Sequence, residues 1–229
     1  MPSLRPLYRP ALFLLCLSGL AASARAQDVP NLDARRIPAE GRGAQDFVPR
    51  GWGIGARAEG DLNGDGRPDY ALQLVPEGHD SSGITAAPES HALLVLLSAE
   101  GGSLRRAGLA TKLLVPAVPQ YGIELSIRRG VLVVNQNYGM SDVADLTHRF
   151  RLDAASGRFL LIGKDTFSYH RPQGPEWPAT RVSENYLTGL RLTTTERYLA
   201  NGKVSATTER GRVARARTFM EDVDEDPDN

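Results

Sequence analysis

The stretch Tyr70-Ala71-Leu72-Gln73-Leu74 places a large apolar side chain at every second position. This spacing is typical of a β-strand with one buried face, because successive side chains of a strand point to opposite sides. A second stretch, Ile123-Glu124-Leu125-Ser126-Ile127-Arg128, has the same alternation. Both patterns therefore predict half-buried strands.

A third run, residues 91–97, is almost entirely apolar and rich in leucine. A buried helix has the same composition, but a run of this length favours a strand covered on both faces. Turn-forming pairs and clusters separate the runs, at Arg129-Gly130, Asp153 to Gly157 and Asn201-Gly202. Asn-Gly predicts a type I′ hairpin, since both residues tolerate positive φ.

No segment beyond residue 26 shows helical periodicity over three turns. The fold class that follows is all-β, built as an antiparallel sandwich, a meander or a small barrel. No Pro/Ser-rich linker interrupts residues 52–219, so we expect one domain in this part of the chain.

The N-terminus has the pattern of a secretory signal peptide. Arg5 and Arg9 precede the apolar run Ala11 to Leu20, and Ala24-Arg25-Ala26 forms a small-x-small cleavage signal. The run is about half the length of a membrane-spanning helix, so no membrane span is expected. Cys16 follows two leucines rather than a small residue, which argues against a lipid anchor. These features predict a secreted, periplasmic or cell-envelope protein.

Cleavage after residue 26 defines the remaining organisation. We expect an N-terminal extended segment over residues 27–50, a β domain over residues 51–219 and an acidic tail over residues 220–229. Six of the eight residues from Glu221 to Asp228 are acidic, which predicts a disordered, solvated tail.

Charge and cysteine content exclude several classes of function. The chain has 27 Lys and Arg against 27 Asp and Glu, and cleavage removes three arginines, leaving a net charge near −3. This balance gives no electrostatic footprint for nucleic acid. A basic run near the end of the chain is interpreted as one solvated strand face, and its members are Arg210, Arg212, Arg215 and Arg217. The single cysteine lies in the signal peptide, which excludes disulfides and zinc–thiolate sites in the mature chain.

One loop, residues 61–69, carries a clear chemical pattern: Asp-Leu-Asn-Gly-Asp-Gly-Arg-Pro-Asp. Oxygen-bearing side chains stand at its first, third, fifth and ninth positions, which are Asp61, Asn63, Asp65 and Asp69. The carbonyl of Arg67 would add a ligand at the seventh position. Calcium accepts six to eight oxygens with relaxed geometry, so this donor set predicts a Ca²⁺ site. Gly64 and Gly66 give the backbone the freedom for the sharp turn.

The pattern Asp-x-Asn-x-Asp-Gly-x-x-Asp running directly into a strand resembles the calcium loop of FG-GAP repeats. These repeats occur in integrin α-subunit propellers and in bacterial VCBS-type exported proteins. An EF-hand is rejected because Leu72 stands where its twelfth-position glutamate belongs, and the same leucine counts against a dockerin loop. A full propeller is rejected because it needs several copies of the motif, whereas residues 142–145 lack the glycines of a second copy.

The remaining candidates are less distinctive. The four histidines, His79, His91, His148 and His170, show no zinc-site spacing, and His148 suits a buried, hydrogen-bonded position. Three aromatic residues are candidates for a sugar or peptide surface if they are exposed, namely Trp52, Tyr169 and Trp177.

We therefore expect an exported calcium-binding, non-catalytic envelope or secreted binding module whose partner is an envelope protein or a glycan. On this hypothesis the ion stabilises the fold by cross-linking the loop and does not contact a substrate. Two alternatives remain open at this stage. One is an exported hydrolase with its site on a loop such as Pro76 to Ser90, and the other is a structural cell-surface subunit.

The cleavage signal makes a direct prediction. Protein purified from its native host should begin at Gln27, because Ala24 and Ala26 satisfy the small-x-small rule. N-terminal sequencing or intact mass measures this. An N-terminus at Met1, or a lipid on Cys16, would contradict it.

Overall fold

A computed structural model describes residues 32–77, 91–115, 122–172, 176–199 and 201–225, and every structural statement below concerns these residues. The expected signal peptide, most of the Pro76 to Ser90 loop and the last four residues lie outside them. No helix in the described ranges is long and apolar enough to cross a membrane.

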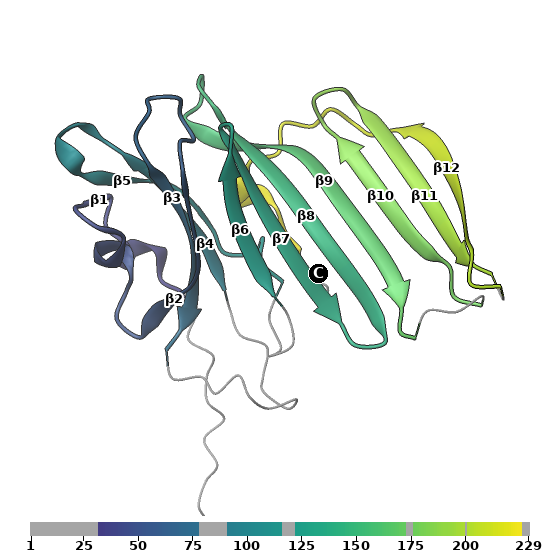
Figure 1. Cartoon of the computed structure of the whole chain (residues 1–229). Helices are drawn as coiled ribbons and strands as arrows, with labels where there is room; N and C mark the ends of the chain where they lie inside the picture. Colours follow the sequence, from purple (N-terminus) through teal and green to yellow (C-terminus); the bar gives the residue numbers. More distant parts are fainter. Residues whose placement is uncertain (1–31, 78–90, 116–121, 173–175, 200, 226–229) are drawn as a thin grey trace, which may run out of the picture.

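The fold is all-β, as predicted, and consists of two antiparallel sheets that do not close into a barrel (Figure 1). The first sheet has the order β1-β5-β4-β3-β2, with strands Glu40–Gly41, Leu104–Ala110, Ala92–Ser98, Asp69–Pro76 and Trp52–Gly60. The second has the order β12-β11-β10-β9-β8-β7-β6, with strands Val204–Arg212, Leu190–Tyr198, Ala179–Asn185, Arg158–His170, Asp142–Asp153, Val131–Gly139 and Ile123–Arg128. Helical structure in these ranges is limited to four 3-10 turns, η1 to η4, at Ala34–Arg36, Ala44–Phe47, Glu100–Gly102 and Met220–Asp222.

Strand β4 is buried on both faces, which confirms the interpretation of the apolar run. Leu93, Val95 and Leu97 belong to a core that also contains side chains of β6 to β9, including Leu132, Phe150 and Phe159. This core lies between the two sheets. The alternate residues Leu94 and Leu96 belong to a second core on the outer face of the first sheet. A strand with two buried faces needs no polar alternation, and the sequence shows none.

The N-terminal part of the described chain covers that outer face. Phe47, at the end of η2, is fully buried there together with Ile37 and Trp52. The expected extended segment is therefore partly folded into 3-10 turns, and Trp52 is a core residue rather than part of a binding surface.

The turns partly follow the sequence prediction. Arg129 and Gly130 both have positive φ, as a type I′ turn requires, and join β6 to β7. Asn201-Gly202 also lies between paired strands, but the type I′ prediction is wrong there. Leu199 pairs with Lys203, so three residues form the loop, and only Gly202 of the Asn-Gly pair has positive φ. Asn201 instead accepts a hydrogen bond from the Lys203 N–H.

The C-terminal segment, residues 219–225, corrects the prediction of a disordered tail beginning at residue 220. Met220 is fully buried between β5 and β9, and Val223 joins the same core. The sequence did not indicate that Met220 and Val223 are buried, because acidic residues surround them and a single 3-10 turn buries only one or two side chains. Residues 226–229 lie outside the described part.

Glu225 fixes the end of this segment by an ionic contact with the second sheet. One of its carboxylate oxygens lies 2.9 Å from Nε2 of His148 and 2.5 Å from the ammonium nitrogen of Lys164. His148 is fully buried, in agreement with the expectation for it. Burial acts to raise the pKa of Glu225, but the hydrogen bonds from His148 and Lys164 outweigh it and hold this pKa below its ordinary value.

This contact predicts a pH-dependent part of the stability. Because the pKa of Glu225 is depressed in the folded state, its stabilisation is present above the unfolded-state pKa of about 4.5 and is lost as pH falls through the lower folded-state pKa. Glu225→Gln should lower the free energy of unfolding by about 1–3 kcal/mol near neutral pH. The difference from wild type should shrink at lower pH.

Denaturant unfolding of both proteins between pH 7 and pH 2.5 measures this difference. Asp222→Asn is the matched control, since Asp222 is exposed at the same segment and should show little effect at any pH. A Glu225→Gln deficit that stays constant down to the lowest pH would contradict the assignment.

Candidate calcium loop

The predicted loop forms the turn between β2 and β3, at the edge of the core between the sheets. Leu62, its second residue, is buried in that core beside the side chains of Leu125 and Leu132. Asp69 begins β3 and is fully buried. The loop is thus anchored at both ends, while its middle residues are exposed.

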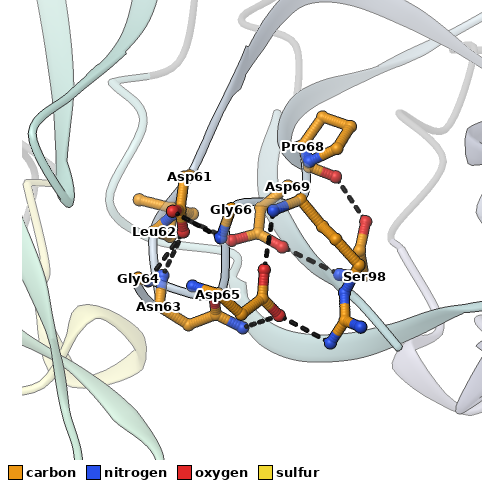
Figure 2. A network of polar contacts seen from close by, with 10 residues as sticks. Asp61, Leu62, Asn63, Gly64, Asp65, Gly66, Pro68, Asp69 and Ser98 are labelled. Atoms are coloured by element: carbon orange, nitrogen blue, oxygen red, sulfur yellow. Dashed lines mark hydrogen bonds and ion pairs between the residues drawn. The ribbon is translucent and has the colours of Figure 1, made fainter. Parts of the chain in front are cut away.

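Asp61 organises the turn by accepting backbone hydrogen bonds. One of its carboxylate oxygens accepts from the N–H groups of Asn63 and Gly64, and the other accepts from Gly66 at 2.9 Å (Figure 2). Gly64 and Gly66 have φ of +82° and +79°, conformations that side chains disfavour. The spacing of the two glycines is therefore explained by the shape of the turn itself.

Asp65 is held by its neighbours on either side. It accepts one hydrogen bond from the Arg67 N–H and further bonds from the Asn63 amide and the Arg67 guanidinium, each at 2.8 Å. Asn63 in turn accepts from the Asp65 N–H at 3.0 Å. The side chain of Arg67 thus takes part in the network as a cation.

Asp69 ties the loop to strand β4. Its carboxylate accepts from the N–H of Leu62 and from the N–H of Ser98, each at 2.8 Å. The Ser98 hydroxyl donates to the carbonyl of Pro68. Ser98 was missed by the sequence analysis, because it lies about 30 residues further along the chain and carries no local signal.

The electrostatics of the three carboxylates differ. Backbone hydrogen bonds from Gly66 and Gly64 lower the pKa of Asp61, and the Arg67 N–H lowers that of Asp65. Burial raises the pKa of Asp69, and the nearby charges of Asp65 and Asp61 raise it further. Asp69 forms no ion pair within the described ranges. It is therefore a buried carboxylate with no cationic partner among the described residues.

The loop has the donor atoms that a Ca²⁺ site requires, but not yet their convergent arrangement. The donor set of three carboxylates, one amide and the Arg67 carbonyl is the chemistry that Ca²⁺ prefers, and the burial of Asp69 beside two further carboxylates favours a cation there. However, no three His, Cys, Asp or Glu side chains in the described chain converge as metal ligands. The oxygens of Asp61 face backbone N–H groups, and those of Asp65 face the Arg67 N–H and the side chains of Asn63 and Arg67, so both carboxylates would have to rotate to bind an ion.

A second candidate site lies at the end of the second sheet, around Trp177. His170 stacks on the indole ring with 4.4 Å between ring centroids, and its Nδ1 lies 3.0 Å from Asp142. The strand register places Ser168 and Thr180 directly opposite each other on the same face. These side chains line a hollow of about 200 Å³. Trp177 is 48 % exposed, whereas Tyr169, at the same rim, is half-buried against Phe167.

Other residues singled out in the sequence have structural contacts. His91 lies beside Gln73, with 3.1 Å between side-chain nitrogens, and His79 lies outside the described residues. The basic run does not form one patch, because Arg217 pairs with Asp153 and Arg215 donates to the Thr188 carbonyl. Arg210 and Arg212 lie on β12.

The comparisons with known proteins provide no relatives to guide the assignment. No family model, no curated protein and no solved structure matches the chain. The functional proposals therefore depend on residues and geometry alone.

Proposed function

We propose that the chain is an exported, non-catalytic binding module of the secreted or periplasmic envelope type, stabilised by one Ca²⁺. The ion would be held by Asp61, Asn63, Asp65, the Arg67 carbonyl and Asp69, as the FG-GAP resemblance implies. The observation that carries the proposal is Asp69, a fully buried carboxylate with no cationic partner in the described chain, close to two further carboxylates.

The argument for a bound cation is the energetic cost of burying the Asp69 carboxylate. An isolated buried charge is costly, and the two backbone hydrogen bonds to Asp69 offset only part of that cost. A bound divalent cation would compensate Asp69 and also relieve the repulsion from Asp61 and Asp65. Its contribution is charge neutralisation and cross-linking of the loop, which stabilises the β2–β3 connection.

Calcium removal tests the proposal. A ligand that binds only the folded state stabilises it by about 2.7 kcal/mol when its concentration is a hundredfold above Kd. Melting curves of the wild type should therefore shift upward in millimolar calcium and downward in excess chelator, and calorimetric titration should show one site. Magnesium should be a weaker substitute, because it demands a smaller octahedral site.

Two variants separate ion binding from packing. Asp65→Ala should abolish the calcium-dependent part of the stability, whereas Asp142→Ala, which removes a 93 % exposed carboxylate elsewhere, should keep it. Leu72→Ala should cost about 2–5 kcal/mol through lost packing and also retain the calcium response. Superimposable curves with calcium and chelator, together with a titration that shows no heat of binding, would overturn the calcium assignment.

A glycan is the partner that the hollow at Trp177 favours. An exposed indole gives a flat apolar platform for a sugar ring, and hydroxyl and carboxylate groups beside it supply directional hydrogen bonds. Trp177 offers that platform, and Asp142, Ser168 and Thr180 provide the polar groups. The hollow is small, so it would hold a single sugar unit of a longer chain.

A glycan array probed with the wild-type protein, followed by titration of the strongest binder, tests this partner class. Trp177→Ala should weaken binding about tenfold, since aromatic contacts contribute about 0.5–1.5 kcal/mol beyond buried area. Leu187→Ala is the matched control, because Leu187 has the same 48 % exposure on a different turn. The glycan assignment fails if no glycan binds or if both variants bind equally.

A further inference from the structure

Strand β12 forms a long open edge of the second sheet. It pairs with β11 from Leu190↔Arg212 to Tyr198↔Val204 without a bulge, and all nine of its residues are exposed. No described element pairs with its other side, and Figure 1 shows it at the outer margin of the sheet. Edge strands are normally protected by proline, charged side chains, a bulge or a covering loop. Within the described residues β12 has no proline, bulge or covering element, and its charged side chains are confined to Glu209, Arg210 and Arg212.

The hydrogen-bond pattern identifies which backbone groups of β12 are free. At the two ends of the ladder, Leu199 N–H donates to the Lys203 carbonyl, and Val213 N–H donates to the Gly189 carbonyl. In an antiparallel pair, residues alternate between facing the neighbour and facing away. The odd-numbered residues of β12 therefore face β11. The residues whose N–H and C=O groups point outward are Val204, Ala206, Thr208, Arg210 and Arg212.

This edge also belongs to a part of the sheet that lacks a second layer. Neither β11 nor β12 contributes a side chain to either buried core. Their facing side chains are mostly polar, as in the Thr194–Thr208 hydroxyl contact of 2.8 Å. A strand stabilised on one side only gains when its free backbone groups are paired.

We propose that β12 pairs antiparallel with β12 of a second copy of this chain, about a two-fold axis at Thr208. Outward-facing residues must meet outward-facing residues, and the register that uses the whole strand centres on Thr208. Val204 then lies opposite the second copy's Arg212, and Ala206 lies opposite the second copy's Arg210. Two Thr208 side chains meet at the axis, a favourable cross-strand pair.

Charge and apolar exposure are both compatible with this register. No residue lies directly opposite a like charge, since Glu209 faces the second copy's Thr207 and both arginines face small apolar side chains. Val204, 51 % exposed in the single chain, is covered by the aliphatic stem of the second copy's Arg212. The strand is thus complementary to itself, which favours a second copy over an unrelated strand.

The assembly closes at two copies. The opposite edge of the same sheet, β6, lies against β2, and the first sheet ends in the two-residue strand β1. One long edge remains per chain within the described residues, so the same surface is used on both copies and no fibre follows. A single strand pair buries less surface than a standard interface, so the dimer should be reversible and concentration-dependent.

Site-specific crosslinking tests the register. In a Cys16→Ser background each variant carries a single cysteine. Thr208→Cys places two sulfurs across the axis, with Cα atoms about 5.5 Å apart, which suits a disulfide. Ser205→Cys is the matched control on the same strand, because its two copies lie about 20 Å apart along the paired strands. Mild oxidation should give a covalent dimer with Thr208→Cys only.

Charge repulsion provides an independent test. Sedimentation velocity of the wild type over a range of concentrations should show a monomer–dimer equilibrium. Ala206→Arg sets two like-charge pairs against the second copy's Arg210, and should raise the dimer Kd about 2- to 30-fold. Ser205→Arg, which faces the second copy's Gly211, should leave Kd unchanged. A monomer at all concentrations, or equal crosslinking of Thr208→Cys and Ser205→Cys, would overturn the proposal.

Discussion

The double burial of β4 is the constraint on which the other parts of the structure depend. Leu93, Val95 and Leu97 need a layer on one side of the first sheet, and Leu94 and Leu96 need another on the opposite side. The second sheet supplies the inner layer, and the N-terminal segment around Phe47 supplies the outer one. Each fully buried leucine contributes roughly 1.5–3 kcal/mol relative to exposure. Neither layer can therefore be removed without exposing a row of leucines that the domain depends on.

The candidate calcium loop, residues 61–69, is attached directly to this doubly buried strand. Asp69 accepts from Ser98 at the end of β4 and from Leu62, whose side chain lies in the inner core. Hydrogen bonds to a charged group contribute about 1.5–3 kcal/mol each, so the two bonds hold the loop in place before any ion binds. An ion would therefore meet a pre-organised anchor at Asp69 but would have to displace backbone N–H groups from Asp61 and both backbone and side-chain donors from Asp65. This competition favours the modest affinity that suffices where calcium is abundant.

Local patterns predicted much of this structure, and their failures have physical causes. Period-two alternation identified β3 and β6, and the leucine-rich run identified β4, because successive side chains of a strand point to opposite faces and burial therefore leaves a local pattern in the sequence. Two features depended on contacts distant in sequence: the docking of the C-terminal segment through Met220 and Glu225, and the bond from Ser98 to Asp69. The stacking of Trp177 on His170 depends on the path of the chain between them, for which the sequence has no periodic pattern. The Asn201-Gly202 turn differs for another reason. Strand register fixed the loop length there, and Asn201 no longer needed positive φ.

The outer strands β10 to β12 differ from the core strands in the polarity of their two faces. Their threonines and charged residues line both faces, so a second apolar layer would have to bury polar groups at a cost of about 1–3 kcal/mol each without partners. Such a sheet can be extended by a further strand through backbone hydrogen bonds, but its faces are unsuited to packing against an apolar surface. An apolar layer is therefore disfavoured on these strands, whereas the outward-facing N–H and C=O groups of β12 are exposed to solvent and pair with no described strand. Lateral pairing is the association that the chemistry of these strands leaves available.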